Sequence, residues 1–128
     1  MIAVFHHVAL IVSSEKSLEF YRLLGFNESF RIARKRDTVV LMEGHGIQLE
    51  FFIDPSHKKS DSDEPIGLRH FALTVDGCLV DEIRNIQNNS SVKLDCSQIM
   101  EDWNGHRFCF IRDYDGIPVE LREQKTST

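Results

Sequence analysis

The chain contains two short phrases twice, and this internal repeat is the feature that most constrains its fold. Gly46-Ile47-Gln48-Leu49-Glu50-Phe51 returns as Gly116-Ile117-Pro118-Val119-Glu120-Leu121. His7-Val8-Ala9-Leu10-Ile11-Val12 returns as His70-Phe71-Ala72-Leu73-Thr74-Val75. Each half therefore opens with a strand that carries a histidine and closes with a strand that carries a glutamate. A repeat of this length indicates two copies of one structural unit.

Apolar periodicity and turn residues predict the order β-α-β-β-β in both halves. In the first half we expect strands at 5–12, 27–33, 38–42 and 47–53, and a helix that is capped by Ser13 or Ser14 and ended by Gly25. In the second half we expect strands at 68–75, 92–95, 107–112 and 117–122, and a helix capped by Asp76 that runs to about Gln87. The segment 96–102 is too irregular to assign.

A polar stretch without periodicity, 54–65, joins the two repeats, which cover about 1–53 and 66–124. The chain has 128 residues, a length that fits one domain and that buries roughly two-thirds of its unfolded surface. We therefore predict one α+β domain, 1–128, that is made of two βαβββ repeats.

Composition excludes several classes of partner. The net charge of -5 argues against nucleic acid, and no apolar run approaches the roughly 18 residues that cross a bilayer. The N-terminus shows no secretory signal, so we expect a cytoplasmic protein without a membrane partner. Cys78, Cys96 and Cys109 are odd in number and lack Cys-x-x-Cys spacing, which favours reduced, buried cysteines over a disulfide framework.

Strand alternation places four polar residues opposite the apolar sets that would cover the helices. These residues are His7, Glu50, His70 and Glu120. If the helix-free faces of the two sheets curve toward one another, the four side chains converge. Two imidazoles and two carboxylates suit a divalent first-row ion, and zinc, nickel, cobalt, manganese and iron are all compatible.

Each of the four residues also has an ordinary interpretation. A single strand histidine is usually a satisfied polar residue, and a single glutamate in a half-exposed strand is usually solvated. Two carboxylates held close together repel unless a cation lies between them, so the matched pairs favour a metal site. Other histidines are expected outside it: His6 on the opposite face, and His45, His57 and His106 in turns or the linker, with His106 kept as a reserve candidate.

Several motifs point to a known family. They are 6–12, Ser17-Leu18-Glu19-Phe20-Tyr21, Leu24-Gly25-Phe26, Gly67-Leu68-Arg69-His70 and 110–116. Through them the sequence resembles, along essentially its whole length, the vicinal oxygen chelate superfamily, the group of glyoxalases, bleomycin resistance proteins and extradiol dioxygenases. It is most similar to small bacterial proteins of the glyoxalase I (lactoylglutathione lyase) type. The resemblance implies paired βαβββ modules with curved mixed sheets and helices on their outer faces.

The resemblance also implies a site and a reaction. One divalent ion, with zinc or nickel favoured, is held by His7, Glu50, His70 and Glu120, a four-ligand pattern like that of glyoxalase I. Such an ion chelates two adjacent substrate oxygens while a proton is shuttled through an enediolate. Glu120 is then expected to be the base, with Glu50 as its catalytic partner. A small-molecule substrate and a homodimer are expected on the same grounds.

Two departures from the glyoxalase I pattern affect the expected substrate. Ile11 occupies the position of an arginine that anchors a glutathione carboxylate, and Asp54 replaces an asparagine. A glutathione adduct therefore loses two expected anchors. Two other functions stay open at this point: a non-catalytic module that binds a drug or metabolite, and a metal-dependent dioxygenase.

Overall fold

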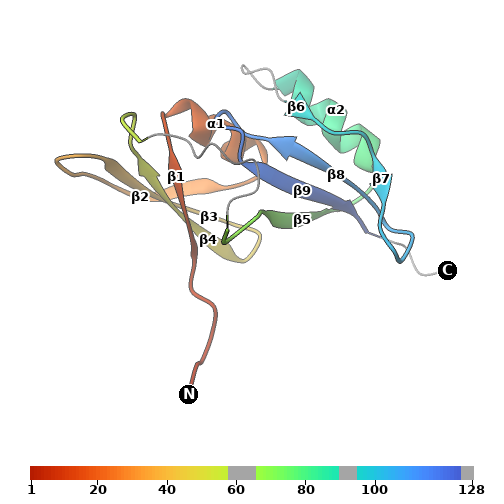
Figure 1. The fold of residues 1–128 in the computed structure, drawn as a ribbon, viewed down its shortest axis with the longest axis horizontal. Coiled ribbons are helices and arrows are strands. Elements are labelled where there is room, and N and C mark those ends of the chain that lie inside the picture. The colour runs from red at the N-terminus through yellow and green to blue at the C-terminus, as the bar shows by residue number, and fades with distance from the viewer. Residues whose placement is uncertain (58–65, 90–94, 125–128) are drawn as a thin grey trace. The chain divides into compact units, whose positions relative to one another are not determined.

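Each half of the chain forms a mixed sheet with one helix. The computed structural model describes residues 1–57, 66–89 and 95–124 (Figure 1). The chain forms two compact units, Met1–Lys59 and Ser60–Thr128. The first unit contains β1 (Val8–Val12), α1 (Lys16–Leu23), β2 (Asn27–Ala33), β3 (Thr38–Gly44) and β4 (Ile47–Ile53). The second contains β5 (Phe71–Val75), α2 (Leu79–Asn89), β6 (Asp95–Cys96), β7 (Met100–Glu101), β8 (Arg107–Arg112) and β9 (Pro118–Glu123). The predicted α+β class with two βαβββ modules is confirmed.

The first sheet has the strand order β1-β4-β3-β2, with β1 parallel to β4 and the other neighbours antiparallel. Alternation along β4 buries Leu49, Phe51 and Ile53 on one face. The Tyr21 ring of α1 lies 4.7 Å from the ring of Phe51, so α1 covers this face and forms the core of the unit with it. Glu50, between two buried neighbours, necessarily points to the opposite face.

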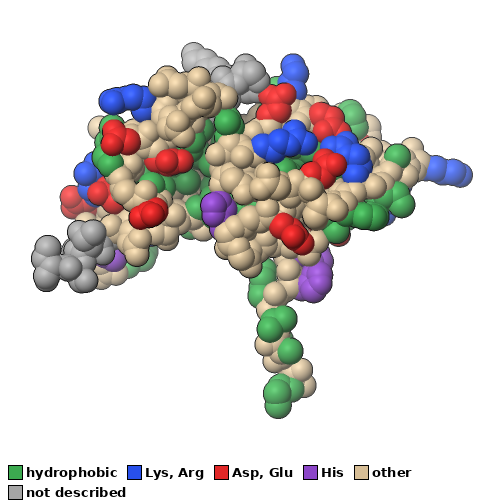
Figure 2. Space-filling view, turned by 180° about the vertical axis from the view of Figure 1, so that it is seen from behind, with side chains coloured by type: hydrophobic (Ala, Val, Ile, Leu, Met, Phe, Trp, Pro, Cys, Tyr) green, Lys and Arg blue, Asp and Glu red, His purple; other side chains and the backbone are tan. Residues whose placement is uncertain are grey.

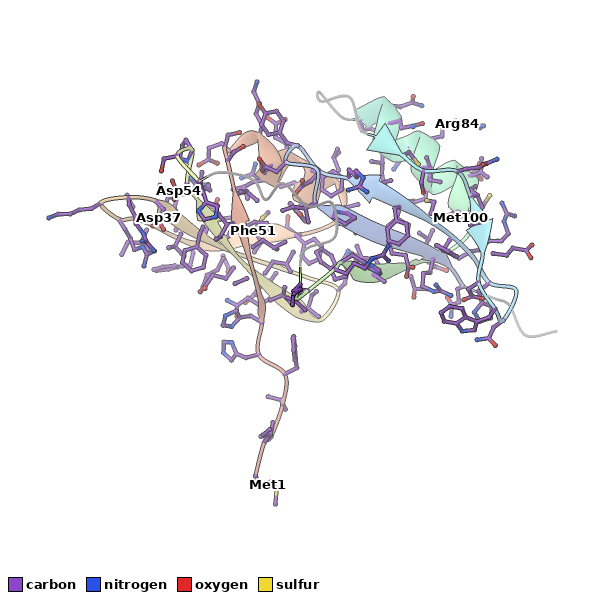
Figure 3. The ribbon with its side chains drawn as sticks, in the orientation of Figure 1. Met1, Asp37, Phe51, Asp54, Arg84 and Met100 are labelled. Atoms are coloured by element: carbon purple, nitrogen blue, oxygen red, sulfur yellow. The ribbon has the colours of Figure 1, made fainter. Side chains whose placement is uncertain are left out.

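Turn chemistry fixes the hairpins of the first sheet. His45 and Gly46 both have positive φ, 53° and 78°, as a tight two-residue connection between β3 and β4 requires. Between β2 and β3, Arg34 donates two hydrogen bonds to Asp37, at 2.6 and 2.7 Å. Asp37, labelled in Figure 3, is buried and its pKa is lowered by the Arg34 guanidinium, whereas Arg34, Lys35 and Arg36 are exposed. The two hydrogen bonds therefore fix a turn whose basic side chains remain exposed to solvent.

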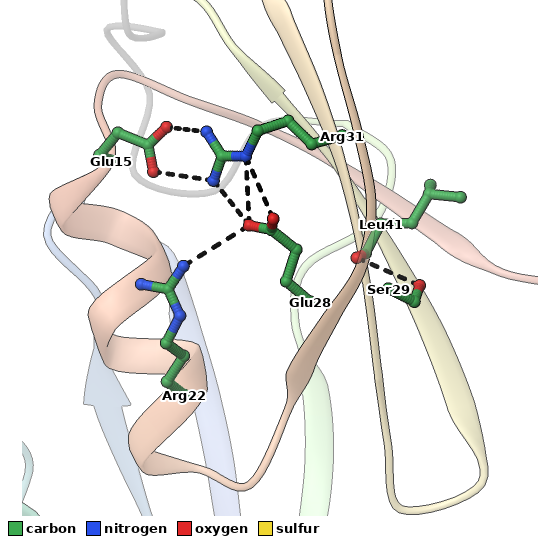
Figure 4. Close-up of polar contacts among 6 residues, drawn as sticks. All are labelled: Glu15, Arg22, Glu28, Ser29, Arg31 and Leu41. Carbon is green, nitrogen blue, oxygen red and sulfur yellow. Dashed lines mark hydrogen bonds and ion pairs between the residues drawn. The ribbon is translucent and has the colours of Figure 1, made fainter.

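An ion-pair network ties α1 to β2 (Figure 4). The Arg31 guanidinium pairs with Glu15, which precedes α1, and with Glu28 at 2.6 Å, while Arg22 lies 3.6 Å from Glu28. The hydrogen bond from Arg31 lowers the pKa of Glu28. Neither Ser13 nor Ser14 is the N-cap residue, because Glu15 occupies that position without a side-chain cap. The Ser14 hydroxyl nevertheless accepts a hydrogen bond from the amide of Lys16 at 3.1 Å.

The second sheet has the order β5-β9-β8-β6, with β5 parallel to β9 and β7 paired to β8. Val119 and Leu121 of β9 are buried on the face that α2 contacts, together with Leu79 and Ile86 of the helix. In the turn before β9, the Asp113 carboxylate accepts hydrogen bonds from the amides of residues 115 and 117, which fixes where the strand starts.

The second unit departs from the sequence expectations in two places. The helix starts at Leu79 and Asp76 does not cap it, because Gly77 has a φ of 110° that no right-handed helix contains. The strand expected at 92–95 lies mostly outside the described residues, and its described part belongs to β6. The unassigned segment 96–102 contains the short strand β7.

The first seven residues form no strand, although one was expected from residue 5. They run away from β1 as an arm that carries exposed apolar side chains: Met1, Ile2, Val4 and Phe5 (Figure 2). On the face drawn in Figure 2, acidic and basic side chains are interspersed. Among the described helices, none combines the length and apolar character that crossing a bilayer demands.

Candidate functional site

The first predicted pair, His7 and Glu50, comes together on the helix-free face of the first sheet. Ala9 of β1 is registered opposite Glu50 of β4, which brings His7, just before β1, beside the carboxylate. The distance from His7 Nε2 to Glu50 Oε1 is 3.8 Å, longer than a hydrogen bond. Both side chains are accessible, with exposed fractions of 36% and 26%. The pair therefore presents one nitrogen and one oxygen to the same space.

His6 belongs to this pair, although alternation placed it on the opposite face. Its Nδ1 atom lies 2.8 Å from His7 Nδ1, and the two rings meet edge to face. The alternation argument fails here because residues 6 and 7 precede the strand. One imidazole must donate and the other accept, so the contact occupies His7 Nδ1 and leaves Nε2 directed at Glu50.

The second predicted pair, His70 and Glu120, repeats this arrangement on the second sheet. His70 Nε2 lies 3.9 Å from Glu120 Oε1, and the exposed fractions are lower, 22% and 13%. The Phe110 ring, registered opposite Glu120, meets the His70 ring edge to face at 4.8 Å. His70 Nδ1 is buried and, within the described residues, has no hydrogen-bond partner. Neither ring nitrogen of His70 is thus satisfied by the described chain.

Sequence reasoning missed the surroundings of Glu120. Arg122 Nη1 lies 3.4 Å from Glu120 Oε2, and the Nη2 atom of the same guanidinium binds Asp102. Burial alone would raise the pKa of Asp102, but the amide of His106, the Arg122 guanidinium and the amide of Asn104 lower it to about 2. The hydrogen bond to Asp102 in turn raises the pKa of Arg122. The only available sequence signal was the i, i+2 spacing of Glu120 and Arg122 on one strand.

The remaining histidines lie away from these pairs. The His45 ring nitrogen Nε2 lies 2.5 Å from the Leu24 carbonyl at the end of α1, so this residue supports the helix. His57 is exposed, and His106, the reserve candidate, lies 4.0 Å from Asp102. Within the ranges 1–57, 66–89 and 95–124, no three His, Cys, Asp or Glu side chains cluster as a metal site. Each unit by itself offers two donors.

The three cysteines are free, as the sequence indicated. Cys109 is buried, and burial raises the pKa of its thiol to about 12, so this residue packs in the core. Cys78 is exposed, which contradicts the expectation that all three are buried.

Comparison with known proteins covers nearly the whole chain. The family model described as the Glyoxalase/Bleomycin resistance protein/Dioxygenase superfamily matches residues 4–121. The uncharacterized protein YwkD of Bacillus subtilis is 37% identical over 93% of this chain and 95% of its own length. The uncharacterized protein YaeR of Escherichia coli is 35% identical with the same coverage.

Solved structures agree on the fold. A glyoxalase family protein from Enterococcus faecalis has a TM-score of 0.78 at 27% identity, covering 94% of this chain and 97% of its own. The fold also occurs in a lactoylglutathione lyase from Agrobacterium tumefaciens (TM-score 0.65, 21% identity, 95% and 94% covered) and in a bleomycin-binding protein (TM-score 0.63, 20% identity, 96% and 100% covered). Members of this fold thus include an enzyme and a binding protein. From the match over residues 4–121, the chain belongs to the glyoxalase/bleomycin resistance protein/dioxygenase superfamily.

Proposed function

We propose that this protein is a divalent-metal-dependent lyase or isomerase of the glyoxalase I type, in which His7, Glu50, His70 and Glu120 hold one ion. The observation that carries the proposal is the repeated pair. In each unit an imidazole Nε2 and a carboxylate Oε1 face one another, 3.8 Å apart in the first and 3.9 Å in the second. Zinc or nickel is the favoured ion, with cobalt, manganese or iron as alternatives.

The donor atoms fit such an ion. Two protein ligands that each lie about 2.0–2.2 Å from one zinc ion are at most about 4.4 Å apart, and both pairs lie within this limit. The spacing is also too long for a hydrogen bond within each pair. His7 Nδ1 is already occupied by His6, as is usual for a ligating histidine, whose second nitrogen is held by a neighbour.

The chemistry follows from the two carboxylates. A divalent ion held by His7, Glu50, His70 and Glu120 would supply Lewis-acid polarisation of two adjacent substrate oxygens, which would make the neighbouring C–H bond more acidic. Glu120 then takes the proton from that carbon, and it returns the proton to the adjacent carbon, with Glu50 as its partner in the exchange. The substrate class is a small α-hydroxycarbonyl compound or its thiol adduct.

The residues near β1 and β4 argue against an anionic thiol adduct. Ile11 is half exposed and offers no positive charge. Asp54, labelled in Figure 3, follows β4, and hydrogen bonds from Ser56 lower its pKa, so it is ionised at neutral pH. We therefore expect neutral thiol adducts to be processed better than the adduct of glutathione.

A binding module without catalysis is the second candidate. It is supported by the bleomycin-binding protein that shares the fold. We also propose a homodimer, which sedimentation would show as a mass of about twice 14.8 kDa.

A kinetic experiment tests the enzymatic proposal. The metal-loaded parent, Glu120→Gln and the control Glu101→Gln are assayed with 2-oxoaldehydes, mixed with either a neutral or an anionic thiol. Glu101 is an exposed residue of β7. Loss of a general base costs about 10²–10⁴ in turnover, so kcat of Glu120→Gln should fall by at least 100-fold at nearly constant KM. Unchanged kcat in Glu120→Gln would refute the role of Glu120. Substrate binding without turnover by the parent would favour the binding module.

A further inference from the structure

A chain of three charged side chains runs from a turn to the Glu120 carboxylate. Asp102, which follows β7, binds Arg122 of β9, and Arg122 Nη1 lies 3.4 Å from Glu120 Oε2. The far end of the chain is anchored to the backbone. Asp102 Oδ1 accepts hydrogen bonds from the amides of Asn104 at 2.8 Å and His106 at 2.9 Å.

Arg122 is restrained from a second direction as well. Its guanidinium carbon lies 5.5 Å from the centre of the Phe108 ring. Phe108 is the residue of β8 that is paired with Arg122. A guanidinium over an aromatic ring is attracted by the ring's negative face. A planar group held by a carboxylate and a ring has little freedom to rotate, so its Nη1 atom is presented to Glu120 in a fixed position.

This arrangement makes the two oxygens of Glu120 different. Oε2 is within reach of Arg122, whereas Oε1 points toward His70 Nε2. We propose that Arg122, anchored by Asp102, is a positioning residue that holds Glu120 with Oε1 directed to the metal-binding side. This inference deepens the proposed function and rests on it.

Among residues 1–57, the first unit has no equivalent of this positioning contact. The residue two positions after Glu50 is Phe52, and the guanidinium carbon of Arg34 lies 5.3 Å from the centre of that ring. Arg34, however, donates two hydrogen bonds to Asp37. Among the described residues no guanidinium donates to Glu50. The two glutamates are therefore unequal: a guanidinium lies 3.4 Å from Glu120 Oε2, whereas Arg34 acts on Glu50 through its charge and donates its hydrogen bonds to Asp37.

Charge and position must be separated in the test, because removing Arg122 alone would leave an extra negative charge that attracts a cation. The double variant Arg122→Gln/Asp102→Asn removes one positive and one negative charge and keeps the net charge constant. Its matched control is Arg107→Gln/Glu123→Gln, which removes another pair from the same sheet, with an Arg107 Nε to Glu123 Oε2 distance of 3.6 Å. Arg122→Lys, which keeps the charge but loses the planar fork, provides a further variant if the double variant fails to fold.

The readout is metal binding in the full chain. Dissociation constants for Zn²⁺ and Co²⁺ are measured by competition with a chromophoric chelator, and the visible spectrum of the Co²⁺ form is recorded. Loss of a neighbour that orients a metal ligand typically weakens binding by about 10–100-fold. For the double variant we expect both dissociation constants to rise at least ten-fold and the Co²⁺ spectrum to change. Arg122→Lys should show a smaller rise, and the control should show none.

The outcomes distinguish this inference from the proposed function. If the parent binds metal and the folded double variant binds it equally well with the same Co²⁺ spectrum, the positioning role is refuted while the metal site stands. Equal weakening in the control would show a general effect on the sheet and would also refute it. If the parent binds no metal, the proposed function and this inference fall together.

Discussion

The orientation of β4 decides whether Glu50 is available to a metal, and Phe51 offers a direct test of it. Phe51 is fully buried, lies 4.7 Å from the ring of Tyr21, and is registered between Leu10 of β1 and Val40 of β3. Replacing a buried phenylalanine by alanine costs about 3–5 kcal/mol. For a chain of this length each kcal/mol lowers the melting temperature by about 3–5 °C, so Phe51→Ala should lower it by roughly 10–25 °C.

The matched control is Phe30→Ala, because Phe30 lies on β2 of the same sheet with 51% of its surface exposed. Its loss should cost no more than about 1 kcal/mol, in the range of surface substitutions. Both variants are unfolded in urea at 25 °C and followed by circular dichroism, which gives the free energy of unfolding by linear extrapolation. Equal losses for Phe51→Ala and Phe30→Ala would mean that Phe51 is not the core residue of β4. The assignment of Glu50 to the helix-free face would then fail.

Two further predictions concern ion pairs. Asp102 has a pKa of about 2 in the folded protein and 3.8 ordinarily, so its stabilising contribution is complete above about pH 4 and is lost as the pH falls toward about 2. Asp102→Asn should therefore lower the urea midpoint at pH 6 and leave it unchanged near pH 2; a deficit of the same size at both pH values would contradict this. Arg31→Ala removes a surface network with Glu15 and Glu28 and should cost about 1 kcal/mol or less, with the loss shrinking in 1 M salt. A loss of several kcal/mol that persists in high salt would contradict the surface character of the network.

The sequence predicted strand bounds accurately where a glycine turn directly precedes the strand. Ile47–Ile53 and Arg107–Arg112 match their predicted bounds. Gly46 and Gly105, with φ of 78° and 77°, lie in the turns just before these strands, and their need for positive φ is visible in the sequence as Gly signals.

Features that depend on tertiary partners were not visible in the sequence. A strand was expected from residue 5, but β1 begins only at Val8, which pairs with Leu49 near the start of β4. The strand β7 has two residues and is defined by its pairing to β8 rather than by any periodicity. The anchoring of Arg122 by Asp102 joins residues 20 apart in the sequence, from a segment that had no predicted structure.

The candidate site was predictable in part. The repeat singled out the two histidines and the two glutamates, and within each unit the structure brings the histidine beside its glutamate. The role of these residues as metal ligands stays a prediction. The contact between His6 and His7 was not predictable, because the two residues precede the strand whose alternation was applied to them. The assembly of the two pairs into one metal site stays a prediction.

Metal content per chain tests that assembly most directly. Three proteins are compared: the parent, His70→Ala and the control His57→Ala, which replaces an exposed histidine outside both pairs. Each is dialysed against traces of zinc, nickel and manganese, and its metal content is measured by elemental mass spectrometry. One ion per chain in the parent and the control, with none in His70→Ala, is the predicted result. No bound ion in the parent, or equal metal content in His70→Ala, would contradict the metal site formed by His7, Glu50, His70 and Glu120.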